Sequence, residues 1–195
     1  KSACIEFMGV ELKKHGLKPR YYERNGLPSI VATTQDTTTP KLLLQAHVDV
    51  VPGNKQLFNL TEREDQLIGR GVYDMKFAAA CYLELARELS HELHNYDFGI
   101  MLTTDEEIGG DNGVGMLIEE GYRAQVCVLP DGGDNWMIQS VCNGVWAIEL
   151  TARGKTAHGS KPWEGENAID KLVAALEDIR QLFKFKEPEK CTLTV

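Results

Sequence analysis

The segment KLLLQAHVDVVPG at residues 41–53 constrains the fold more than any other part of the sequence. Its run of leucines predicts a strand buried on both faces, which is typical of parallel sheets covered by helices. The strand ends in His47, and Asp49 and a Pro-Gly turn follow. An imidazole and a carboxylate are costly to bury without partners, so their position at the end of a core strand indicates a functional role.

Two further apolar segments end in acidic residues. GIMLTT is followed by Asp105, Glu106 and Glu107, and AQVCVLP is followed by Asp131. In an open parallel sheet, the carboxyl ends of the strands lie along one edge, where the ligand crevice forms. We therefore expect three buried strands to bring these side chains together with His47.

The rest of the first part of the chain predicts an α/β fold. Helical spacing of Ile5, Met8 and Leu12, with Gly16 as a stop, predicts a first helix, and a second is expected to begin at Asp74. Strand-like runs occur at RYY and SIVATT, and residues 52–65 are expected to form a loop. Apolar runs that alternate with helical stretches predict a mostly parallel sheet flanked by helices.

The pattern changes near residue 137. MIQSV, GVWAIELTARG and CTLTV read as strands around one long helix, ENAIDKLVAALEDIRQLF, without further alternation of strand and helix. We therefore expect one domain over residues 1–142 and part of a smaller α+β domain over residues 143–195.

Composition excludes several classes of protein. The 195 residues carry a net charge of −8 and contain no basic cluster with interleaved aromatics, which argues against nucleic-acid binding. No window approaches the roughly 18 apolar residues of a membrane span, and the first residues lack the plan of a signal peptide, so a cytoplasmic location and no membrane partner are expected. The five cysteines are scattered and odd in number, which predicts free core thiols.

A metal explains why acids and an imidazole would gather at one edge. The carboxylates would otherwise repel each other, and zinc accepts a mixture of His nitrogen and carboxylate oxygen. Asp74 follows the glycine-rich turn GRGVY and could reach back to bridge two ions about 3.5–4 Å apart.

Each feature also has a purely structural explanation. His47 could be a satisfied buried histidine, Asp74 a helix N-cap, and the acidic pair solvated loop charge. The joint occurrence after three apolar strands favours the metal. The histidines of HELH at residues 91–94 are three apart rather than the four of a zincin helix. Asp134 could compete with Asp131 as a ligand, but DGGDN favours a turn.

Four motifs, LLLQAHVDVVPG, GRGVYDMK, TTDEEIGG and VLPDGG, resemble those of the M20 metallopeptidases in order and spacing. This group contains aminoacylase, acetylornithine deacetylase, succinyl-diaminopimelate desuccinylase, carnosinase-like dipeptidases and glutamate carboxypeptidase. GKTAHGSKPWEGENAI is similar to the signature of the family's lid domain. The resemblance spans nearly the whole chain and implies that residues 1–142 are part of a zinc-peptidase-like catalytic domain and residues 143–195 part of a lid and dimerisation domain.

The resemblance implies a role for each ligand position. His47 and Asp131 match the ligands of one zinc, Glu107 a ligand of the second, and Asp74 the bridging ligand, which is often followed by a cis peptide bond. Asp49 matches the carboxylate that orients His47.

Two further residues match catalytic positions. Glu106 matches the general base, and His158 matches the lid histidine that crosses to the other subunit of a dimer and stabilises the oxyanion. The implied reaction is hydrolysis of an amide in a small peptide or N-acyl amino acid, with two zinc ions per full-length subunit, or cobalt or manganese in their place. A non-catalytic homologue and a mononuclear hydrolase remain the alternatives.

The match is incomplete in two respects. The family needs a further zinc-binding histidine after the lid. Here the last histidine is His158, and none of the other four histidines lies where that ligand belongs. We therefore expect an amino-terminal fragment that hydrolyses little alone. The full-length protein is expected to form a homodimer through the lid domain. Phe77 follows DMK where relatives commonly place glycine, a packing variation that could narrow the cleft.

Overall fold

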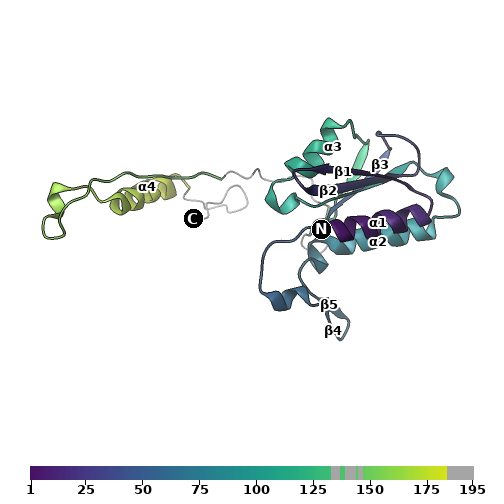
Figure 1. Ribbon diagram of the computed structural model, residues 1–195, viewed down its shortest axis with the longest axis horizontal. Helices are drawn as coiled ribbons and strands as arrows, with labels where there is room; N and C mark the ends of the chain where they lie inside the picture. Colours follow the sequence, from purple (N-terminus) through teal and green to yellow (C-terminus); the bar gives the residue numbers. More distant parts are fainter. Residues whose placement is uncertain (133–136, 139–143, 145–146, 184–195) are drawn as a thin grey trace. The chain divides into compact units, whose positions relative to one another are not determined.

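The computed structural model describes residues 1–132, 137, 138, 144 and 147–183 (Figure 1). The chain divides into two compact units, Lys1–Met137 and Ile138–Val195, and each is described by itself.

The first unit is built around a five-stranded sheet with the order β1-β2-β6-β3-β7. Its strands are β1 (Lys18–Arg24), β2 (Leu27–Thr33), β3 (Leu42–His47), β6 (Phe98–Thr103) and β7 (Val126–Val128). β6, β3 and β7 pair in parallel, whereas β2 is antiparallel to both β1 and β6. Among the described strands of this sheet, only β2 therefore opposes the common direction, and the predicted α/β class is confirmed.

Helices cover both faces of this sheet. α1 (Ser2–Lys14) and α2 (Phe77–Glu88) lie side by side on one face, and α3 (Met116–Glu119) lies on the other (Figure 1). Because side chains alternate along a strand, Leu44 and Ile100 face the core beneath α1 and α2, whereas Leu43 and Met101 face α3. This double burial explains the continuous apolar runs in the sequence.

Both predicted helices of this unit form, with one shift. α1 buries Ile5, Met8 and Leu12, and Gly16 follows it with φ +94°, a conformation that favours glycine. The second helix begins at Phe77 with Lys76 as its N-cap, so the start expected at Asp74 was wrong. Asp74 has φ −119° and ψ 94° inside a distorted turn over Val72–Lys76, which removes the N-cap explanation. The peptide bond from Asp74 to Met75 is cis, as the resemblance implied.

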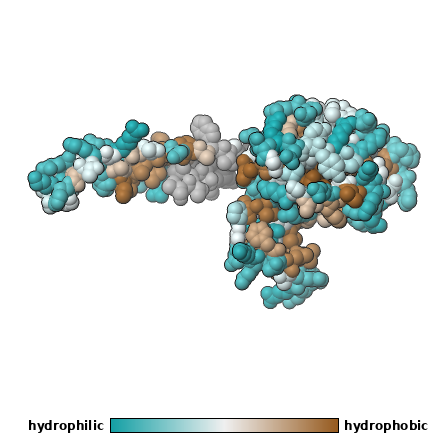
Figure 2. Space-filling view, viewed as in Figure 1, coloured by the Kyte–Doolittle hydropathy of each residue, from teal (hydrophilic) through white to brown (hydrophobic). Residues whose placement is uncertain are grey.

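The segment between β3 and α2 contains more structure than expected. A 3₁₀ turn spans Lys55–Phe58, and β4 (Thr61–Arg63) pairs with β5 (Gln66–Ile68) as an antiparallel hairpin. Figure 2 shows apolar side chains gathered on this segment, and the exposed ones are Leu57, Phe58, Leu60, Leu67 and Ile68. The expected loop over residues 52–65 is therefore only partly correct.

Further short turns occur in both units. The first unit has 3₁₀ turns at Leu93–Asn95 and Glu106–Ile108 and a π turn at Asp111–Gly115, and the second unit has a 3₁₀ turn at Pro162–Glu164.

The second unit contains the long helix that the sequence predicted. α4 (Ala168–Leu182) begins after Asn167, whose side chain accepts a hydrogen bond from the Ile169 N–H at 2.9 Å. The strand expected over residues 144–154 is wrong for its described residues, 144 and 147–154, which carry no strand. A strand requires a neighbour for its backbone groups, and the described bridge joins Lys155 to Glu166 instead. CTLTV and most of MIQSV lie outside the described residues.

Exposure corrects two further expectations. β7 is exposed along its length because it lies at the edge of the described sheet. The expectation that this strand is buried was therefore wrong. Cys81 and Cys127 are exposed free thiols rather than core thiols, and Cys4 is half-buried. Cys142 and Cys191 lie outside the described residues.

Across the described part of the chain, we find no helix with the length and apolar character needed to cross a membrane.

Candidate metal centre

The register of the parallel strands brings the predicted ligands to the same level. His47 on β3 lies opposite Thr103 on β6, and the next three residues after Thr103 end at Glu106. On the other side of β3, Leu44 lies opposite Val128, the last residue of β7. His47 and Asp131 each come three residues after this pair, so they reach the same level of the sheet. The edge expected from the sequence is therefore formed.

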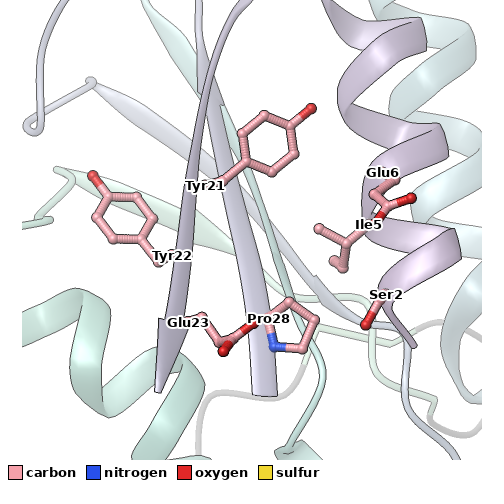
Figure 3. A pocket seen from close by; sticks show the side chains of 7 residues that line it. All are labelled: Ser2, Ile5, Glu6, Tyr21, Tyr22, Glu23 and Pro28. Atoms are coloured by element: carbon pink, nitrogen blue, oxygen red, sulfur yellow. The ribbon is translucent and has the colours of Figure 1, made fainter. Parts of the chain in front are cut away.

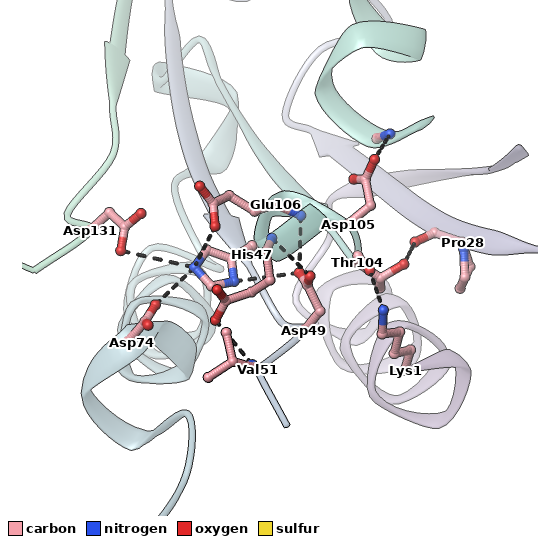
Figure 4. A network of polar contacts seen from close by, with 12 residues as sticks. Lys1, Pro28, His47, Asp49, Val51, Asp74, Thr104, Asp105, Glu106 and Asp131 are labelled. Atoms are coloured by element: carbon pink, nitrogen blue, oxygen red, sulfur yellow. Dashed lines mark hydrogen bonds and ion pairs between the residues drawn. The ribbon is translucent and has the colours of Figure 1, made fainter. Parts of the chain in front are cut away.

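His47 lies at the centre of this edge and is completely buried. Its Nε2 lies 3.0 Å from Asp74 Oδ1, 3.7 Å from Glu106 Oε2 and 3.9 Å from Asp131 Oδ1 (Figure 4). Its Nδ1 lies 3.4 Å from Asp49 Oδ1. The imidazole is thus surrounded by carboxylates that come from four separate segments.

Two sets of ligand atoms lie close enough together to hold an ion. The first set is His47, Asp74 and Glu107, and the second is His47, Glu106 and Asp131, with the ligand atoms of each set within 4.8 Å of one another. All four predicted ligands therefore belong to one cluster. Glu106, predicted as the base, also lies at ligand distance.

The donor set fits a divalent metal. Both ring nitrogens of His47 are buried and lack a hydrogen-bond partner, which is costly for a polar group inside a protein. A cation bound at Nε2 would satisfy that atom and would offset the repulsion between the surrounding carboxylates.

Asp49 fixes the segment that carries the two glutamates. It is buried, and its carboxylate accepts hydrogen bonds from the backbone N–H of Glu106 at 3.3 Å and of Glu107 at 3.1 Å. The Glu107 side chain in turn accepts a hydrogen bond from the Val51 N–H at 3.2 Å. The backbone therefore orients Glu107 toward the cluster before any ion binds.

Glu106 has an altered acidity. Partial burial raises the pKa of its carboxyl group, and the negative charges of Asp131, Glu107 and Asp49 raise the pKa further, whereas His47 opposes the shift. A raised pKa makes this carboxylate a stronger proton acceptor, which suits a general base.

Asp105 has a role that the sequence did not reveal. It was grouped with the possible ligands, but it is fully buried and points away from His47 (Figure 4). Its Oδ2 accepts hydrogen bonds from the N–H groups of Asn112 at 2.7 Å and Gly113 at 2.8 Å. A Cβ at Gly113 would lie only 2.1 Å from Asp105 Oδ1, so glycine is required there. The signal in the sequence was Gly113 of DNGVG, and only the tertiary structure shows that this glycine lies against Asp105.

His158 belongs to the second unit. Its side chain is exposed, and its Nδ1 lies 2.8 Å from Ser160 Oγ and accepts a hydrogen bond from the Ser160 N–H at 3.2 Å. Its catalytic role stays a prediction.

Neither histidine of the HELH segment belongs to a described metal group, and Leu93 between them is buried. Asp134 lies outside the described residues.

A separate cavity of about 320 Å³ lies between α1 and the hairpin of β1 and β2 (Figure 3). None of its lining residues is a predicted ligand, and they are Ser2, Ile5, Glu6, Tyr21, Tyr22, Glu23 and Pro28.

Comparison with known proteins identifies relatives of this chain. A "Probable succinyl-diaminopimelate desuccinylase" from Staphylococcus epidermidis is 33% identical over 195 residues, which cover 95% of this chain and 48% of that protein. Aminoacylase-1 from Sus scrofa is 30% identical over 206 residues, covering 96% of this chain and 50% of that protein. The chain spans about half the length of the curated relatives it matches.

Solved structures share the fold. Human carnosine dipeptidase 1 matches with a TM-score of 0.55 at 18% identity, covering 67% of this chain and 32% of that one. Residues 43–192 match the family model of peptidase family M20/M25/M40. This match covers most of the chain and agrees with the ligand cluster at the strand ends. The chain therefore belongs to peptidase family M20/M25/M40.

Proposed function

We propose that this chain carries the metal-binding part of a hydrolase that cleaves an amide bond in a small peptide or an N-acyl amino acid. The observation that carries the proposal is the convergence of carboxylates from separate segments on Nε2 of buried His47, an atom without a hydrogen-bond partner. Relatives named for desuccinylase, aminoacylase and dipeptidase activities support the substrate class.

We assign the ligands residue by residue. His47 and Asp131 would hold one zinc ion, Glu107 would contribute to a second, and Asp74 would bridge the two, with Asp49 orienting the imidazole. Bound zinc would supply a water of lowered pKa and would polarise the amide carbonyl. Cobalt and manganese share some of the ligand preferences of zinc, so either ion could replace it.

Glu106 is the proposed general base. Its carboxylate would accept a proton from the attacking water and return it to the leaving amine, which its raised pKa favours. Glu107 cannot share this role while the Val51 N–H and a metal hold its carboxylate. His158 would stabilise the negative charge that develops on the former carbonyl oxygen.

Three organisational proposals accompany this function. Residues 1–142 form the catalytic part, residues 143–195 belong to a lid, and the full-length protein forms a homodimer through that lid. We also propose a cytoplasmic location.

A mononuclear centre is the second candidate. Both described ligand groups share His47, so among the described residues one imidazole serves both. A single ion at His47, with Glu106 as the base, would support the same reaction.

Metal binding to the purified 195-residue chain tests the proposal. Titration calorimetry and elemental analysis should give one or two equivalents of zinc, and His47→Ala should weaken binding about 100-fold or more. His94→Ala is the matched control, because His94 belongs to no described ligand group.

The base assignment needs a separate measurement. Release of amine from N-acyl amino acids should be slow for this chain, and Glu106→Gln should lower it by about 100- to 10,000-fold while zinc stays bound. Unchanged release in this variant would remove the assignment, and a chain that binds no zinc would remove the function itself.

A further inference from the structure

Tyr73 is the aromatic residue next in the sequence to one member of the metal cluster. The residue directly precedes Asp74, whose Oδ1 lies 3.0 Å from His47 Nε2. The residue is 53% exposed, so it is accessible to a ligand. The strong apolar and π character of such a ring makes it a favourable surface for planar apolar groups.

Phe77 supports this ring from behind. The two ring centroids are 6.3 Å apart and the planes are inclined by 29°, which is a stacked arrangement. Phe77 itself is half-buried and packs against the main core cluster. A ring stacked on a core residue keeps its orientation, so less conformational entropy is lost when a ligand contacts it. Phe77 therefore has a structural partner in Tyr73.

The Tyr73 ring also reaches the segment that carries the opposite ligand. Gly132 follows Asp131, and a Cβ at Gly132 would lie 3.6 Å from Tyr73 Cε1. Gly132 has φ +61°, a conformation that disfavours larger residues. The Tyr73 ring therefore extends from the segment that contributes Asp74 to the segment that contributes Asp131.

We infer that Tyr73, backed by Phe77, is a specificity-determining residue that favours an apolar, planar substituent on the scissile amide. The inference rests on the proposed function and names its substrate class. An aromatic acyl group would exclude water from the exposed ring face. An anionic acyl group such as succinyl would instead lose hydration at its carboxylate beside the ring, close to Asp74 and Asp131.

Binding of three probes to the zinc-loaded chain tests this inference. The probes are N-benzoylglycine, N-acetylglycine and N-succinylglycine, and titration calorimetry measures their dissociation constants. Tyr73→Ala should weaken N-benzoylglycine binding by about three- to tenfold. N-Acetylglycine binding should change by less than about twofold, because its acetyl group gains little from the ring. N-Succinylglycine binding should not weaken, because the variant removes the ring that costs its carboxylate hydration.

Two variants serve as controls. Tyr73→Phe keeps the ring and should retain the preference for N-benzoylglycine. Tyr21→Ala removes a tyrosine of similar exposure, 54%, from β1 and should leave all three constants unchanged.

Equal weakening of all three probes, or an unchanged ratio of N-benzoylglycine to N-acetylglycine affinity in Tyr73→Ala, would overturn the inference. Absence of binding of all three probes to the unmodified chain would also overturn it. The proposed function has a separate readout, since it fails when zinc does not bind or no amine is released. Zinc-dependent hydrolysis with an unchanged probe ratio would therefore reject the specificity and leave the function intact.

Discussion

Glu106 and Glu107 are neighbours of the same type, yet their surroundings give them different chemistry. The Glu107 carboxylate accepts a hydrogen bond from the Val51 N–H, whereas burial and nearby acids raise the pKa of Glu106. A group whose acidity is altered beside a ligand cluster is a good candidate for proton transfer.

This raised pKa has a consequence for stability. The folded chain binds the Glu106 proton more tightly than the unfolded chain does. Ionisation of Glu106 therefore destabilises the fold as the pH rises above 4.5, the ordinary pKa of this carboxyl group. In the presence of a chelator, Glu106→Gln should therefore raise the melting temperature at pH 7. The difference should vanish at pH values below the unfolded pKa, where both side chains are neutral. Thermal denaturation with exposed Glu88→Gln as control checks this, and an equal effect of both variants would contradict it.

Asp105 supports the glutamates without touching the cluster. Its carboxylate accepts two backbone hydrogen bonds, from Asn112 and Gly113. Its own carbonyl accepts two more, from the Ile108 N–H at 3.2 Å and the Gly110 N–H at 2.9 Å. Loss of the carboxylate would leave N–H groups without partners and would loosen the turn that carries Glu106.

We expect Asp105→Ala to lower the free energy of unfolding by about 3 kcal/mol and to weaken zinc binding. Asp105→Asn should retain most of both, because an amide oxygen can accept the same bonds. Chemical denaturation and zinc titration measure the two effects. Exposed Asp111→Ala is the matched neighbour, and a loss as large in that variant would argue against a specific role for Asp105.

At the scale of elements, β3 positions the site through its register. Leu44 is buried under α1 and α2, three residues before His47, and pairs with both β6 and β7. Packing of this strand therefore determines where the imidazole meets the carboxylates.

Leu44→Ala should cost about 2–5 kcal/mol in the free energy of unfolding, because it leaves a cavity beside the strand. Leu57→Ala removes the same atoms from an exposed position, where 41% of the residue contacts solvent, and should cost less than about 0.5 kcal/mol. Urea denaturation of both variants tests the comparison. Similar losses in the two would mean that β3 packing contributes little.

At the scale of the whole molecule, all described ligand atoms belong to the first compact unit. The predicted catalytic part, residues 1–142, contains this unit entirely. His158 is the one proposed functional residue in the second unit.

A chain of residues 1–142 should therefore fold and bind zinc with an affinity within about twofold of the 195-residue chain. Zinc should raise the melting temperature of both chains, since it binds only the folded state with these ligands. Calorimetry on the two chains gives the comparison. A shorter chain that folds but binds zinc much more weakly would show that the second unit contributes to the centre.

The sequence by itself determined the α/β class, the helix that ends before Gly16, the helix that follows Asn167, and the meeting of His47, Glu107 and Asp131 at one edge. These follow from local pattern, because apolar periodicity sets the elements and the parallel direction of strands sets which ends meet. The motifs also anticipated the cis bond after Asp74.

Only the tertiary structure decided which acids face the cluster. Asp105 and Glu106 are adjacent in the sequence, yet one is held by Gly113 and the other lies 3.7 Å from His47. The exposure of Cys81 and Cys127 and the stack of Tyr73 on Phe77 were likewise hidden. The physical reason is that burial, acidity and ring contacts depend on neighbours distant in the chain or on the exact backbone path, which residue type and spacing alone do not encode.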